Sequence, residues 1–155
     1  MRNLPLVLCI LALAIAAVPA TAGAEGDGQP LPAAKFVRVA DAACARYYRA
    51  LSRLPKVTTL AGIARFYRQA HPIAVRFLRE LRALVPPRPR AVTYARLLQA
   101  ISASNALDQP TIKAAEQRDA KRLERLFERS AALDRTIRAL TMKLGLKVCA
   151  NPPRL

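Results

Sequence analysis

Apolar side chains recur every three or four residues along most of this chain, a spacing typical of helices that pack on one face. The clearest stretch lies between residues 119 and 150, with a stripe formed by Leu123, Leu126, Ser130, Leu133, Ile137, Leu140 and Leu144. Asp119 precedes the first turn as a candidate N-cap, and Gly145 follows the stripe where a glycine can end a helix with positive φ. This stretch predicts a long helix against which the rest of the chain packs.

Two earlier segments carry the same spacing. In residues 33–54 the stripe is Val37, Ala40, Cys44, Tyr47, Leu51 and Leu54, and Pro55 ends the predicted helix. The next helix begins at Thr58 or Thr59, and its stripe is Leu60, Ile63, Tyr67, Ala70, Ala74, Phe77, Leu81 and Leu84. Pro72 lies off this stripe, so we expect a kink there and not a break.

The pattern weakens after the proline-rich connector at residues 86–89. One reading is a helix over residues 90–107, followed by a restart capped by Asp108 that runs through Pro110 to Gln117; a single helix kinked at Pro110 fits nearly as well. Short connections between amphipathic helices favour antiparallel neighbours. We therefore predict an all-α fold, an up-down-up-down four-helix bundle over residues 33–150, with a C-terminal tail at 151–155.

The first residues read as a targeting segment. A short basic start is followed by an apolar run, and small residues then offer cleavage after Ala22 or Ala24. We predict a signal peptide at residues 1–24, a flexible leader at 25–32 and a secreted or otherwise extracytoplasmic protein; the alternative is an uncleaved membrane anchor. Cys9 lies too early in the apolar run, and after Leu8, for a lipid-anchoring site.

Cleavage would leave a pair of cysteines, Cys44 and Cys149. In an exported chain an even count favours a disulfide, here with a loop of about a hundred residues and an upper stabilisation of ~4–5 kcal/mol. Free thiols or a metal site are the alternatives. His71 is the only histidine, which makes a metal site a poor fit, and we expect neither a metal nor a cofactor.

Three short motifs give the chain a resemblance. They are Asp41-Ala42-Ala43-Cys44-Ala45, the joint at residues 81–87 and the closing Gly-Leu-x-x-Cys-Ala of residues 145–150. With these motifs, residues 41–150 resemble a loose group of uncharacterised exported helical proteins of actinobacteria, some of them lipid-anchored. The resemblance implies no activity and no functional residue.

Charge gives the main indication of function. Lys and Arg number 26 against 10 Asp and Glu, a net charge of +16. A field of this sign attracts polyanions, although spread charge is often only a solvated surface. Export argues against nucleic acid, which leaves anionic envelope polymers, a lipid surface or an acidic protein as partners. The candidate anion-binding patch is Arg65, Arg68, Arg76, Arg79 and Arg82.

Catalytic patterns are sparse, so we predict a non-enzymatic binding or structural protein. His71 reads as a surface residue, and the Glu124–Glu128 pair as a solvated, salt-bridged face with Lys121, Arg125 and Arg129. A polar cluster at Ser102, Ser104, Asn105, Asp108 and Gln109 is unusual for a buried helix. We interpret it as a loop or frayed helix facing water. The alternative is a small-ligand or enzymatic site formed by Asn105, Asp108 and Ser130.

Overall fold

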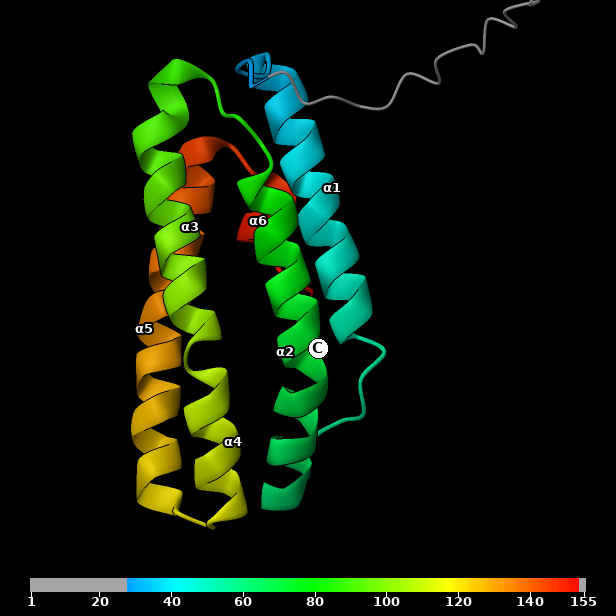
Figure 1. The fold of residues 1–155 in the computed structure, drawn as a ribbon, viewed down its shortest axis with the longest axis vertical. Coiled ribbons are helices and arrows are strands. Elements are labelled where there is room, and N and C mark those ends of the chain that lie inside the picture. The colour runs from blue at the N-terminus through cyan, green and yellow to red at the C-terminus, as the bar shows by residue number, and fades with distance from the viewer. Residues whose placement is uncertain (1–27, 154–155) are drawn as a thin grey trace, which may run out of the picture.

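Helices are the only regular secondary structure in the computed structural model, which describes residues 28–153 (Figure 1). They are α1 (Ala33–Leu51), α2 (Leu60–Arg82), the 3-10 turn η1 (Arg88–Arg90), α3 (Ala91–Asn105), α4 (Asp108–Glu116), α5 (Ala120–Leu144) and α6 (Lys147–Ala150). The predicted all-α class is confirmed. The predicted signal peptide at 1–24 lies outside the described residues.

The helix ends follow from local chemistry at three predicted positions. The Thr59 side chain caps α2 by accepting a hydrogen bond from the Gly62 amide at 3.0 Å. Asp119 caps α5 in the same way through the Arg122 amide, also at 3.0 Å. Gly145 ends α5 with φ of 75°, a left-handed conformation that costs glycine little. α2 continues through Pro72 without a break.

Two helix boundaries differ from the prediction. α1 ends at Leu51, and residues 52–54 form turns, since the residue before Pro55 is disfavoured in the helical conformation. The third helix is broken before Asp108, as one of the two predicted schemes had it, but α3 ends at Asn105 instead of residue 107; the alternative of one helix kinked at Pro110 is wrong. Pro110 is tolerated in the first turn of α4 because amides there have no helical partner to lose. Asp108 is therefore the first residue of α4 and not its cap.

The helices enclose two apolar clusters, one above the other in the view of Figure 1. The upper cluster lies where α1, α2, α3, α5 and α6 meet and is centred on Phe36, Leu81, Tyr94 and Leu144. The lower cluster is built by α2, α4 and α5 with Leu107, because α1 accompanies only part of α2 (Figure 1). α2 packs on α1, α3 and α4, while α5 packs on α3, α4 and α6.

The upper cluster also fixes the start of the described chain. Phe36 is fully buried and meets Tyr94 edge to face, with ring centroids 5.0 Å apart. The predicted stripe of this helix omitted Phe36 and used Val37, which is only partly buried. Leu31 packs on the same cluster, and its amide donates to the Val85 carbonyl at 2.9 Å. The end of the predicted flexible leader is thus docked on the connector between α2 and α3.

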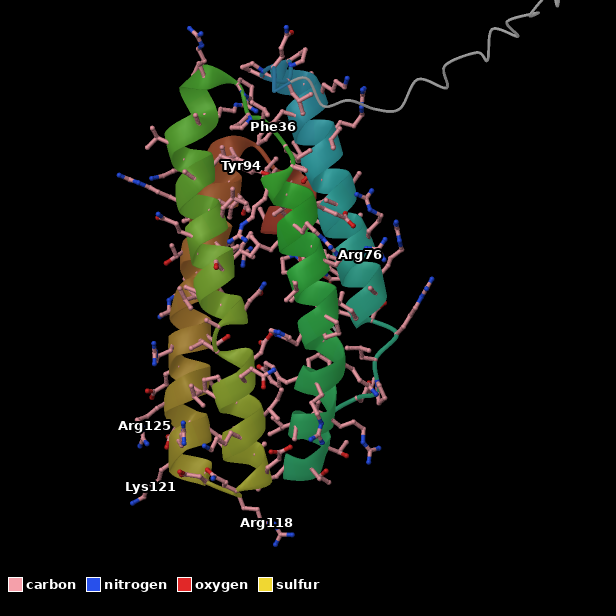
Figure 2. The ribbon with its side chains drawn as sticks, in the orientation of Figure 1. Phe36, Arg76, Tyr94, Arg118, Lys121 and Arg125 are labelled. Atoms are coloured by element: carbon pink, nitrogen blue, oxygen red, sulfur yellow. A yellow bond between two sulfur atoms is a disulfide. The ribbon has the colours of Figure 1, made fainter. Side chains whose placement is uncertain are left out.

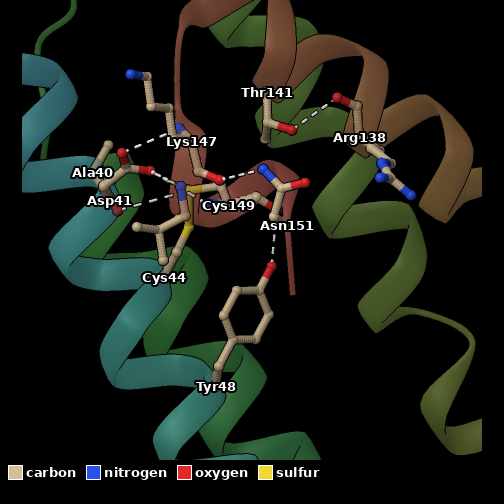
Figure 3. Close-up of a disulfide and its surroundings, with 10 residues drawn as sticks. Ala40, Asp41, Cys44, Tyr48, Arg138, Thr141, Lys147, Cys149 and Asn151 are labelled. Carbon is tan, nitrogen blue, oxygen red and sulfur yellow. Dashed lines mark hydrogen bonds between the residues drawn. A yellow bond between two sulfur atoms is a disulfide. The ribbon is translucent and has the colours of Figure 1, made fainter. Parts of the chain in front are cut away.

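The last helix is held to the first by a set of contacts that we call the C-terminal clasp: Asp41, Cys44 and Tyr48 of α1 against α6 (Figure 3). Cys44 and Cys149 form the predicted disulfide, with Cα atoms 5.3 Å apart. The Tyr48 hydroxyl donates to the Cys149 carbonyl at 3.0 Å. Because α6 also packs on α5, it joins α1 to α5 across the bundle.

No helix among residues 28–153 combines the length and the hydropathy needed to cross a membrane.

Candidate functional site

The candidate arginines of α2 do not form one surface. Arg68 forms an ion pair with Glu116 of α4, and Arg76 pairs with Glu80 at 3.4 Å. Arg46 of α1 binds the same Glu80 carboxylate at 2.9 Å. Arg68 therefore ties α2 to α4, whereas the Arg76–Glu80 pair lies within α2 and Arg46 makes the contact between α1 and α2. Arg65 lies beside a shallow hollow at the start of α2.

The remaining two arginines meet part of the polar cluster. Arg79 and Arg82 line a groove of about 450 Å³ between α2 and α3, opposite Ser102 and Asn105. We call this hollow, with His71 at its edge, the basic groove. Within residues 28–153 no carboxylate lies in ion-pair distance of Arg79 or Arg82. Both guanidinium groups are available to an anion that enters the groove.

His71 is held by a buried acid. Its Nδ1 lies 2.8 Å from Oδ2 of Asp108, whose side chain is 12% exposed. A carboxylate at this distance favours the proton on Nδ1. Burial raises the pKa of Asp108 above its ordinary value, although the hydrogen bond and charge of His71 act in the opposite direction. The predictions that His71 is a simple surface residue and that Asp108 faces water are both wrong, because the start of α4 carries Asp108 against α2.

The polar cluster is divided by this arrangement. Asn105 donates through Nδ2 to the Ala74 carbonyl at 3.3 Å, which fixes its amide at the basic groove. Asp108 is engaged with His71, and no residue of α5, Ser130 included, lines the groove. The alternative site of Asn105, Asp108 and Ser130 is not assembled as one pocket. Its nearest counterpart is the basic groove, which retains Asn105.

Sequence reasoning missed a second basic hollow. Arg122, Arg125 and Arg129 of α5 surround a space of about 320 Å³ beside Pro110 and Leu126. Their spacing of three and four residues is a signal that the sequence already carried. Glu124 and Glu128 are exposed, as a solvated face requires, but they take part in none of the ion pairs of the described residues, so only the predicted salt bridges are wrong. Arg118, Lys121 and Arg125 all lie towards one end of the molecule (Figure 2).

The described residues contain no group of three His, Cys, Asp or Glu side chains placed to hold a metal ion. The chemistry that the basic groove offers is hydrogen-bond donation by guanidinium, hydroxyl and amide groups. Such donors bind phosphate or carboxylate oxygens, and arginine does so with two parallel hydrogen bonds.

No protein-family model matches the chain, and comparisons with curated proteins and with solved structures found no match either. Assignment of function therefore depends on the geometry of the described residues.

Proposed function

We propose that this chain is an exported, non-enzymatic binding protein that holds phosphate or carboxylate groups of the cell envelope in the basic groove. The observation that carries the proposal is the pair Arg79 and Arg82, which face Ser102 and Asn105 without an acidic partner in the described part of the chain. The envelope group would belong to an anionic polymer or to a lipid surface.

The rigidity of the groove supports this function. Asp108 orients His71 on the α2 side, and one turn away the bond from Asn105 to the Ala74 carbonyl holds the end of α3 against α2. Preorganised walls reduce the entropy lost on binding. The net charge of +16 adds a long-range attraction for anions, which speeds association and weakens as salt is raised.

The compartment and the helix arrangement belong to the same proposal. The Cys44–Cys149 disulfide is compatible with an oxidising location outside the cytoplasm, which favours envelope anions over nucleic acid as partners. We retain the signal peptide at 1–24. We also retain the up-down-up-down bundle, with its third position shared by α3 and α4.

Two double substitutions test the groove. The oxidised protein and its Arg79→Gln/Arg82→Gln variant are titrated with phosphatidylglycerol vesicles and with a phosphate-bearing wall polymer over a salt series. Loss of one charge-assisted contact of about 1.5 kcal/mol weakens binding roughly tenfold, so we expect at least that loss at low salt. Whichever of the two probes binds identifies the source of the anion.

The control is Lys35→Gln/Arg38→Gln, which removes the same charge from exposed positions of α1 outside the groove. We expect it to weaken binding only slightly, through the overall field. Equal losses in both variants would assign the attraction to net charge alone and reject the groove. Binding of an acidic protein without either anionic probe would also reject it, in favour of a protein partner.

A further inference from the structure

Another hollow, distinct from the basic hollows described above, lies between α1 and α5 beside α6 and has a volume of about 450 Å³. We call it the amphipathic cleft. α1 packs on α2 and α6, whereas α5 packs on α3, α4 and α6, so the short α6 is the main bridge between the two walls. The disulfide forms part of the lining, and the rest of the C-terminal clasp lies around it (Figure 3). The clasp therefore holds the cleft at a defined width.

The interior of the cleft is apolar and aromatic. Its lining includes Phe77 and Leu81 of α2, Leu97 and Ile101 of α3, and Ile137 of α5. The Tyr47 ring is stacked on Phe77, with centroids 4.4 Å apart and planes inclined by 14°. These flat and branched surfaces suit a ligand with a flat apolar body, and the volume is in the range of small-molecule sites.

Tyr47 also offers a polar contact inside the cleft. Its hydroxyl has no hydrogen-bond partner within residues 28–153, yet it is not among the fully enclosed unpaired groups. The hydroxyl therefore keeps some exposure, and Tyr47 is one of the residues that line the cleft. Burial and the nearby Asp108 raise the pKa of Tyr47 well above its ordinary value, so the hydroxyl keeps its proton and can donate.

The mouth of the cleft carries more positive than negative charge. Arg135 and Arg138 of α5 line it, and neither takes part in an ion pair of the described residues. Asp134 is the only acid in the lining. Two guanidinium groups and the Tyr47 hydroxyl thus stand against one carboxylate, a balance that favours an anion over a cation.

We propose that the amphipathic cleft is a binding site for a small molecule with a flat apolar body and a single anionic head group. The apolar body lies against the stacked pair Tyr47–Phe77 and Ile101, and the head group lies at Arg135 and Arg138. Asn105 lines both the cleft and the basic groove, but the arginines of the two hollows are different residues, and the site does not depend on the function proposed for the groove.

A matched pair of fluorescent probes tests the cleft in the oxidised protein. 8-Anilinonaphthalene-1-sulfonate has the flat body and an anionic group, and N-phenyl-1-naphthylamine has nearly the same body without charge. We expect both to bind, with the anionic probe tighter by about tenfold, the gain from one charge-assisted contact. Failure of the anionic probe to bind, or equal affinity for the two probes, overturns the proposal.

Three variants locate the site. Arg135→Gln/Arg138→Gln should abolish the preference for the anionic probe and leave the neutral probe unchanged. The control Lys35→Gln/Arg38→Gln removes the same charge from exposed positions of α1 outside the cleft and should change neither. Asp134→Asn should tighten the anionic probe by about twofold to fivefold, because a repulsive charge is removed. Weaker binding of the anionic probe in Asp134→Asn would indicate a site that prefers cations as ligands and would reject the anion-binding assignment of the cleft.

Ser104→Trp tests the volume of the cleft from its polar rim, since Ser104 is among the lining residues. The added ring should displace both probes at an unchanged melting temperature. Undiminished binding of the probes would place them elsewhere. If this variant does not fold, the charge variants still decide the proposal, because they leave the apolar lining intact.

Discussion

The contact between His71 and Asp108 places an ionisable pair where two helices meet. Asp108 is nearly buried and His71 is one-third exposed at the side chain. Burial of a carboxylate disfavours its charged form, while a histidine partner favours it. For Asp108 the burial effect is the larger, and its pKa is raised. The pair joins α4 to α2, and its contribution to the free energy of unfolding therefore depends on pH.

Asp108→Asn tests the sign of that cost. A carboxyl with a raised folded-state pKa stabilises the fold most below the ordinary aspartate pKa of about 4, and this contribution is lost as pH rises through the raised value. We expect the melting temperature of the wild type to fall relative to Asp108→Asn as pH rises from about 4, the ordinary aspartate value, towards the ordinary histidine range. Thermal melts of both proteins measure this difference.

The comparison is Asp119→Asn, which makes the same replacement at an exposed position, so a drift caused by burial should be smaller there. A wild type that gains stability relative to Asp108→Asn over the same window would mean that the histidine partner outweighs burial.

Single residues also mark where sequence reasoning succeeds. Thr59, Asp119 and Gly145 act within three or four residues of their own positions, so local pattern was sufficient to predict their roles. His71 and Asp108 are 37 residues apart, and no local rule connects them. Phe36 was missed by one position because the buried face of α1 must serve α2 and α6 together.

Among the helices, α6 is the clearest example of one that is stabilised by contacts with other helices and not by its own sequence. It has only four residues, too few to be stable alone. The Asp41 carboxylate of α1 accepts hydrogen bonds from its first three amides: Lys147 at 3.1 Å, Val148 at 2.9 Å and Cys149 at 3.2 Å (Figure 3). These amides have no partner within the helix, and the acid also complements the positive helix end.

Asp41→Ala should destabilise the fold by about 1–3 kcal/mol, since bonds from several amides to one charged acceptor are lost together. Urea unfolding of the oxidised protein measures the change. Asp119→Ala, which removes a conventional single cap, should cost about 1 kcal/mol. A smaller loss for Asp41→Ala than for Asp119→Ala would show that the disulfide alone is sufficient to hold α6.

The sequence predicted an irregularity between α3 and α4, but it left two schemes open: a broken helix and a single helix kinked at Pro110. Serines, Asn105 and Pro110 indicated an interruption, and the broken-helix alternative is confirmed. Its position depends on contacts with α2, where Asn105 binds the Ala74 carbonyl and Asp108 binds His71. Since those partners lie about 30 residues upstream or more, the local pattern suggested Pro110 as readily.

Over the whole molecule, the positively charged side chains have different surroundings. Some cations tie helices together, as Arg46 does through Glu80 and Arg68 through Glu116. Others border hollows: Arg79 and Arg82 the basic groove, Arg135 and Arg138 the amphipathic cleft. Net charge could be counted from the sequence, but this division could not, because it depends on where the few acids come to lie.

The disulfide acts on the molecule as a whole because it closes a loop of 105 residues. Removing it should cost about 2–5 kcal/mol, mainly through a less restricted unfolded state. We expect reductant to lower the melting temperature of the wild type, and Cys44→Ala/Cys149→Ala to match the reduced protein with no response to reductant. A melting temperature that is unchanged by reduction would contradict this account.

The C-terminal clasp has a consequence for synthesis. α6 supplies contacts to α1 that only residues 147–149 can make, more than a hundred positions after Asp41 and Cys44. Cys149 must therefore be synthesised before α6 can cover the amphipathic cleft between α1 and α5. A chain that ends at a premature stop codon upstream of residue 147 would keep most of the helical sequence but would lack α6. Binding of a ligand in the cleft would therefore show that translation had passed Cys149.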